Sequence, residues 1–140
     1  MKLILETLTY KTTGDTDILD ITPDVSRCVR GAGIAHGFVN LFIPGSTGAL
    51  TTIEFESGVV SDLKDAIERM APKNIPYAHD LRWGDGNGYS HVRAALLGPS
   101  LQVPIIAGNL ALGTWQQIVL CDFDNRPRQR RVLVQLVGEV

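Results

Sequence analysis

The sequence is poor in cysteine, and its two cysteines are far apart. Cys28 and Cys121 form no C-x-x-C pair, which excludes zinc ribbons and thioredoxin-type redox motifs. We expect both thiols to be unreactive core side chains in a protein that stays reduced.

Long apolar runs and an excess of basic residues are also missing. No run approaches the roughly 20 residues that cross a membrane. The apolar start of the chain is soon interrupted by Glu6 and Lys11, which is not the pattern of a signal peptide. We therefore expect a cytoplasmic protein with no membrane partner. A net charge of −2 and a pI near 5.9 argue against nucleic acid as a partner.

Alternating apolar and polar residues predict six β-strands in one domain of residues 1–140. A hydrophobic content of 44% at this length is enough to form a buried core. The alternation is typical of half-buried strands, and it recurs in residues 2–10, 36–43, 50–56, 101–106, 115–123 and 131–137. Gly108 and Asn109 have the composition of a hairpin turn.

Three short helices fit between these strands. Pro23 suits the first turn of one, Ser57 opens a second that Pro72 ends, and Ser90 can cap a third that closes at Gly98. Regular helical crossovers between the strands are missing. We therefore predict an α+β fold: a compact, mainly antiparallel β-sheet sandwich with two to three short helices.

The first candidate site is YAHDLRWGDGNGYSHVRA, residues 77–94, which contains two of the three histidines. Imidazole nitrogens and side-chain oxygens are the ligands that divalent ions prefer. The candidate metal ligands are His79, Asp85, Asn87 and His91. His91 would lie in the first turn of a helix capped by Ser90, where free N–H groups favour a phosphate. The alternative is a simple turn rich in Asp, Asn and Gly, with two structural histidines.

Two familiar ion-binding loops are not matched. DGNG begins like a calcium loop, but the later acidic ligand positions carry Tyr, Ser, His and Val. GSTG, residues 45–48, lacks the lysine and the spacing of a P-loop. The hydroxyls of Ser46 and Thr47 and the N–H groups of this turn can nevertheless hold an oxyanion. The alternative is a tight turn between strands. Glu54, on the next strand, is exposed or lines a cleft, and is a candidate catalytic residue.

An arginine-rich segment, CDFDNRPRQRR, is the third candidate. Arginine binds phosphate through two parallel hydrogen bonds, so Arg126 and Arg128 are candidate phosphate ligands. The alternative is a solvated hairpin tip whose ion pairs contribute little to stability. Upstream, Gln116 is a further candidate phosphate ligand, whereas we expect Trp115 to be a core residue.

Together these segments resemble the YjbQ-like family, whose members are often described as secondary thiamine-phosphate synthases. The resemblance is carried by GALTTIE, YAHDLRWGDGNGYSHVRAALLGPSLQVPI and LGTWQQIVLCDFDNRPRQRR, which in this order span nearly the whole chain. It implies a compact α+β fold that assembles as a homotrimer. It also implies a cluster of histidines and polar residues near the subunit contacts, with bound metal in some members.

The chain departs from the family pattern at one position. Many members have a histidine before the LT-x-x-E segment, where this chain has Gly45. A three-histidine metal site cannot form from the equivalent positions. His79 and His91 are the imidazoles that match, with Glu54 and the 85–87 segment as polar partners.

Three functions remain open at this point. As an enzyme, the chain would couple a pyrimidine pyrophosphate to a thiazole phosphate, with a divalent metal, Zn or Mg, neutralising the departing pyrophosphate. The catalytic residues would be His79, His91 and Glu54. The phosphate groups would contact Ser46, Thr47, Ser90, Gln116, Arg126 and Arg128. As a non-catalytic trimer, it would bind a metal or a phosphorylated small molecule without turnover. As a scaffold, its histidines would only hold subunits together.

Overall fold

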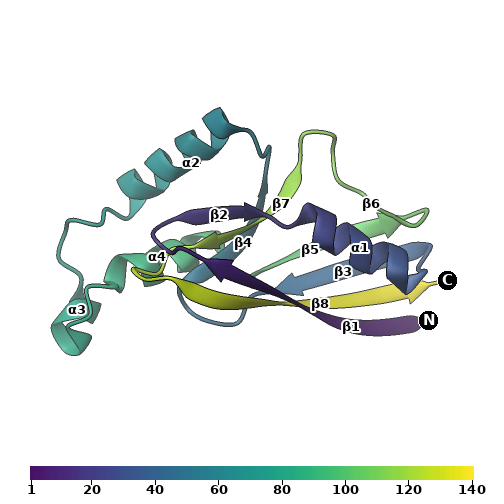
Figure 1. Ribbon diagram of the computed structural model, residues 1–140, viewed down its shortest axis with the longest axis horizontal. Coiled ribbons are helices and arrows are strands. Elements are labelled where there is room, and N and C mark those ends of the chain that lie inside the picture. The colour runs from purple at the N-terminus through teal and green to yellow at the C-terminus, as the bar shows by residue number, and fades with distance from the viewer.

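The computed structural model describes residues 1–140 and confirms the α+β class, with four helices instead of two to three (Figure 1). The elements in chain order are β1 (Lys2–Thr12), β2 (Asp17–Asp20), α1 (Thr22–Ala32), β3 (His36–Phe42), β4 (Gly48–Ile53), α2 (Ser57–Met70), α3 (Ala78–Trp83), α4 (Gly88–Leu97), β5 (Ser100–Ile106), β6 (Asn109–Leu110), β7 (Gln117–Asp122) and β8 (Arg128–Glu139). No helix is long and apolar enough to cross a membrane.

The strands form two antiparallel sheets. One has the order β1-β8-β3-β5-β6 and the other the order β2-β7-β4. The long strand β8 pairs with β1 from Lys2↔Gly138 to Thr12↔Arg128, and its other edge pairs with β3. The arginine-rich end of β8 therefore lies beside the end of β1, at one end of the larger sheet.

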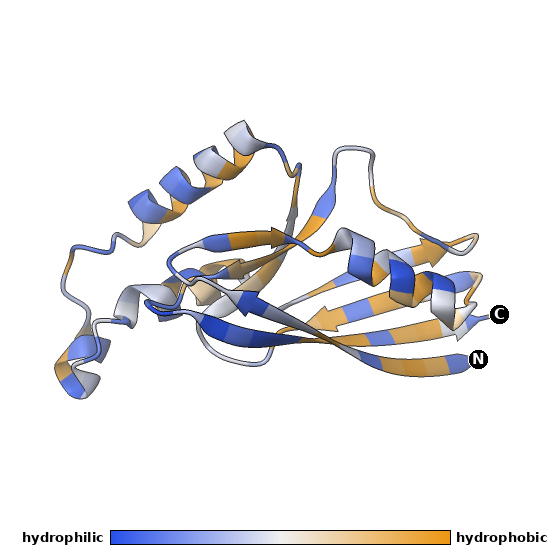
Figure 2. Ribbon diagram, viewed as in Figure 1, coloured by the Kyte–Doolittle hydropathy of each residue, from blue (hydrophilic) through white to orange (hydrophobic).

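The main core lies where the larger sheet meets α1 and one face of the smaller sheet. Its members include Val39, Val134 and Leu136 of the larger sheet and Leu50 and Leu120 of the smaller one. Burying each such side chain contributes about 1.5–3 kcal/mol. Figure 2 shows the corresponding apolar and polar stripes along α1 and α2.

A second apolar cluster covers the opposite face of the smaller sheet. Val119 and Cys121 of β7 pack there with Ile67 of α2 and Ala94 of α4. Strand β7 is thus buried on both faces, which explains its continuous apolar run. Burial raises the pKa of Cys121 to about 12, and Cys28 is half-buried.

Several local expectations need correction. Trp115 is 73% exposed, because β7 begins only at Gln117 and leaves Trp115 in the preceding loop. Helix α4 begins at Gly88, so Ser90 lies inside the helix and does not cap it. The carboxylate of Asp80 accepts the Gly88 N–H instead, at 2.9 Å.

Candidate functional site

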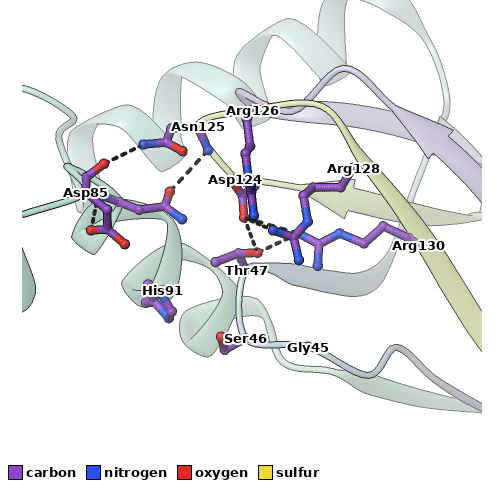
Figure 3. Close-up of a pocket in the computed structure, with 11 residues that line it drawn as sticks. Gly45, Ser46, Thr47, Asp85, His91, Asp124, Asn125, Arg126, Arg128 and Arg130 are labelled. Atoms are coloured by element: carbon purple, nitrogen blue, oxygen red, sulfur yellow. Dashed lines mark hydrogen bonds and ion pairs between the residues drawn. The ribbon is translucent and has the colours of Figure 1, made fainter. Parts of the chain in front are cut away.

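A polar cavity of about 440 Å³ lies where three connections and the start of α4 meet (Figure 3). The connections are β3–β4, α3–α4 and β7–β8. No hydrophobic residue lines the cavity. The lining residues are Gly45, Ser46, Thr47, Asp85, Asn87, His91, Asp124, Asn125, Arg126, Arg128 and Arg130. The fold thus gathers candidate residues from three separate segments of the sequence.

A buried ion pair forms one side of the cavity. Arg130 is 4% exposed, and it donates from Nε and Nη2 to the two carboxylate oxygens of Asp122 at 2.7 and 2.8 Å. The hydroxyl of Thr12 also donates to Asp122. Burial alone would raise the pKa of Asp122, but these donors and the Asp124 N–H outweigh it and lower that pKa. Arg130 is therefore held in place before any ligand arrives.

Asp124 lies beside this buried pair and also lines the cavity. Its Oδ2 accepts the Thr47 hydroxyl at 3.0 Å and lies 3.6 Å from Arg128 Nη1 and 3.9 Å from Arg130 Nη2. Its Oδ1 is buried without a hydrogen-bond partner. The charges of Arg128 and Arg130 thus face carboxylates. Arg126 is exposed at the cavity and has no carboxylate within ion-pair distance.

The opposite wall is tied to the β7–β8 connection by amide groups. The Asn125 N–H donates to Asn87 Oδ1 at 3.1 Å, and Asn125 Nδ2 donates to the Asp85 carbonyl at 2.9 Å. The buried Ser90 hydroxyl also donates to Asn87 Oδ1. The amide oxygen of Asn87 is therefore already occupied, and Ser90 lies beneath the wall and does not line the cavity.

His91 lines the cavity at this wall, and His79 lies beside His91 without lining the cavity. The ring centroids of His79 and His91 are 4.3 Å apart. His79 Nδ1 is 3.4 Å from a carboxylate oxygen of both Asp80 and Asp85. Ligand atoms of His79, Asp80 and Asp85 all lie within 4.8 Å of one another. One imidazole and two carboxylates form a donor set that fits a divalent ion. This set contains Asp80, which the sequence did not single out as a ligand.

Gly45 occupies a turn that is shaped for glycine. Its φ is +115°, a conformation that strains other residues, and a Cβ there would lie 3.0 Å from Arg130 Nη1. A histidine at this position would meet both obstacles.

Four predicted site residues do not line the cavity: His79, which lies beside His91, and Ser90, Glu54 and Gln116. Glu54 follows the last residue of β4, and its side chain does not line the cavity. Gln116 lines a separate hollow and donates to the Thr52 hydroxyl at 3.2 Å. The structure therefore brings together the predicted residues of the GSTG turn, the 85–91 segment and the arginine-rich segment. His79 and Ser90 lie beside this cavity without lining it, and Glu54 and Gln116 lie elsewhere.

Four residues of the site were not among those predicted from the sequence: Asp80, Asp124, Asn125 and Arg130. A signal for Arg130 was present, because residues two apart on a strand share a face. Arg130 alternates in step with the buried Val132 and Val134, which predicts that it points inward. Asp80, in the unpredicted helix α3, gave no comparable signal.

Comparisons with known proteins identify the family. Residues 6–139 match the family model described as UPF0047 protein YjbQ-like. A UPF0047 protein of Archaeoglobus fulgidus is 42% identical over 91% of this chain and 97% of its own length. The UPF0047 protein YugU of Bacillus subtilis is 33% identical over 96% of this chain and all of its own length.

Solved structures agree with this match. A YbjQ-like protein of unknown function from Sulfolobus solfataricus superposes with a TM-score of 0.93 at 30% identity, over 99% of both chains. A YjbQ/UPF0047 family protein from Clostridium acetobutylicum gives a TM-score of 0.86 at 33% identity, over 94% of this chain and 99% of that one. The chain therefore belongs to the UPF0047 YjbQ-like family.

Proposed function

We propose that the protein binds the phosphate or pyrophosphate group of a small metabolite in the arginine-lined cavity. The observation that carries this proposal is Arg126, which faces a cavity lined by no hydrophobic residue and has no carboxylate within ion-pair distance. Arg128 lies beside it, and the Ser46 hydroxyl borders the same space. Planar guanidinium groups match the geometry of phosphate oxygens.

The charge of the cavity explains why a metal ion would help. Three arginines against two aspartates leave the lining with one net positive charge when His91 is neutral. A pyrophosphate carries more negative charge than this. We propose that a divalent ion, Zn or Mg, is held by His79, Asp80 and Asp85, where it would neutralise part of the phosphate charge.

The reaction that we propose is of the thiamine-phosphate synthase class. A pyrimidine pyrophosphate would lose pyrophosphate as its methylene carbon forms a bond to the nitrogen of a thiazole phosphate. Arg126 and Arg128 would stabilise the departing pyrophosphate, and His91 could protonate it. Because Glu54 lies outside the cavity, this proposal gives it no role. If binding occurs without turnover, the protein is a phosphometabolite-binding module.

The partner that we propose is the same chain, in a homotrimer that works in the cytoplasm. The face of the larger sheet that points away from the core carries the exposed Leu3, Leu5, Phe42 and Ile106. Such an apolar face is typical of a subunit contact. Light scattering should give three times 15.2 kDa, and Leu5→Glu should reduce that mass. A wild-type mass of one chain would refute the trimer.

A titration with inorganic phosphate, followed by amide chemical shifts, tests the central proposal. Arg126→Gln should weaken phosphate binding about tenfold or more, because it removes a charged hydrogen-bond donor. Arg131→Gln is the matched control: Arg131 is also exposed near this end of β8 but does not line the cavity. Equal binding by the two variants would overturn the assignment.

A further inference from the structure

A second hollow of about 250 Å³ adjoins the polar cavity. Both hollows are lined by Gly45, Ser46 and His91. Figure 3 shows these three residues along one side of the polar cavity, away from Arg126. The two hollows therefore meet at the GSTG turn and the start of α4.

The chemistry of the second hollow differs from that of the first. Besides the shared residues, it is lined by Gly48, Ala94, Ala95 and Pro99. None of these four side chains carries a charge or a hydrogen-bonding group. A group rich in hydroxyls would lose hydrogen bonds with water there and gain few in return, whereas an apolar group would be favoured.

Gly45 keeps the boundary between the hollows free of a side chain. The positive φ of Gly45 disfavours any residue with a side chain, so the backbone conformation of the turn keeps this boundary open. A ligand that places its phosphate against Arg126 and Arg128 can extend past Gly45 toward Ala95. The two hollows would then form one site with a charged part and an apolar part.

We propose that the second hollow binds the uncharged organic part of the same ligand whose phosphate occupies the polar cavity. This inference rests on the proposed phosphate-binding function and narrows its substrate class. The ligand is a phosphate ester of a compact, largely apolar group of about one ring, not a sugar phosphate. Ala95 and Gly45 are the residues that set this specificity.

The test compares two probes, inorganic phosphate and phenyl phosphate, by amide chemical-shift titration. The wild type should bind phenyl phosphate about tenfold more tightly than inorganic phosphate, because the ring buries apolar surface. Ala95→Leu should fill the second hollow and abolish this preference, while inorganic phosphate binds as in the wild type. Ala95 is exposed on α4 and leucine favours helices, so the variant should fold.

Val92→Leu is the control, because Val92 lies on the same helix but lines neither hollow. It should keep the preference for phenyl phosphate. A wild type without any preference, or an Ala95→Leu variant that keeps it, would overturn the inference while the proposed function stands. Failure of inorganic phosphate to bind the wild type would refute the proposed function and this inference with it.

Discussion

Replacing Arg130 by methionine should destabilise the protein far more than replacing an exposed arginine. The substitution keeps an unbranched side chain of similar length but leaves Asp122, which is fully buried, and Asp124, which is 2% exposed, without the Arg130 charge. Breaking a buried pair in this way costs about 3–5 kcal/mol. Typical domains have only about 5–15 kcal/mol of total stability.

Urea denaturation measures this loss. With a slope of about 2 kcal/mol per molar urea, the midpoint should fall by about 1.5–2.5 M. Arg27→Met is the control, because the Arg27–Asp24 pair is largely exposed and should contribute less than about 1 kcal/mol. Similar midpoint shifts in both variants would refute the claim that Arg130 forms a preorganised, buried side of the cavity.

The same pair predicts how the loss depends on pH. Because the folded-state pKa of Asp122 is lowered, its contribution to stability is complete above the unfolded value of 3.8 and is lost as pH falls through the folded value. In Arg130→Met, burial raises that pKa instead. The folded-state pKa of Asp122 then lies above 3.8 in the variant and below 3.8 in the wild type. The difference in stability between them should therefore begin to narrow above pH 3.8 and continue to narrow as pH falls below it.

Three further predictions concern single residues. Gly45→Ala should lower the free energy of unfolding by about 1–2 kcal/mol, because alanine is strained at the positive φ of this position. Gly31→Ala, at an open position in α1, should not lower it, and equal effects of the two substitutions in thermal melts would contradict strain at residue 45. Glu56 caps α2 with a lowered pKa, so Glu56→Gln should remove a stabilisation that the wild type loses as pH falls below 4.5. Cys121 should resist iodoacetamide at pH 8 until the protein unfolds; rapid native labelling seen by mass spectrometry would contradict its burial.

Much of the fold could be predicted from local patterns, because the long strands and the helices α1 and α2 have clear periodicity. The short elements gave no such signal. Strand β2 has four residues and follows Asp15 and Thr16, whose positive φ values are not readable from their residue types. Helix α3 has six residues without a buried side chain, so it lacks an apolar stripe.

The residue types of the candidate site could be predicted from the sequence, but the contacts that each of these residues makes could not. The sequence indicated arginines, histidines and a hydroxyl-bearing turn, and the fold brings them to one cavity. The alternation along β8 indicated that Arg130 points inward, but the sequence did not show that Arg130 meets two carboxylates while Arg126 has no carboxylate partner. That depends on the start of β8 meeting Asp122 at the end of β7, in the other sheet. Nor could the sequence show that Gln116 faces another hollow.

The most direct test of the central claim is a crystal structure grown with pyrophosphate and Mg²⁺. The account predicts pyrophosphate oxygens within hydrogen-bond distance of Arg126 and Arg128, with the ion against His79, Asp80 and Asp85. A cavity that holds only water at saturating pyrophosphate, with Arg126 turned to bulk solvent, would contradict it.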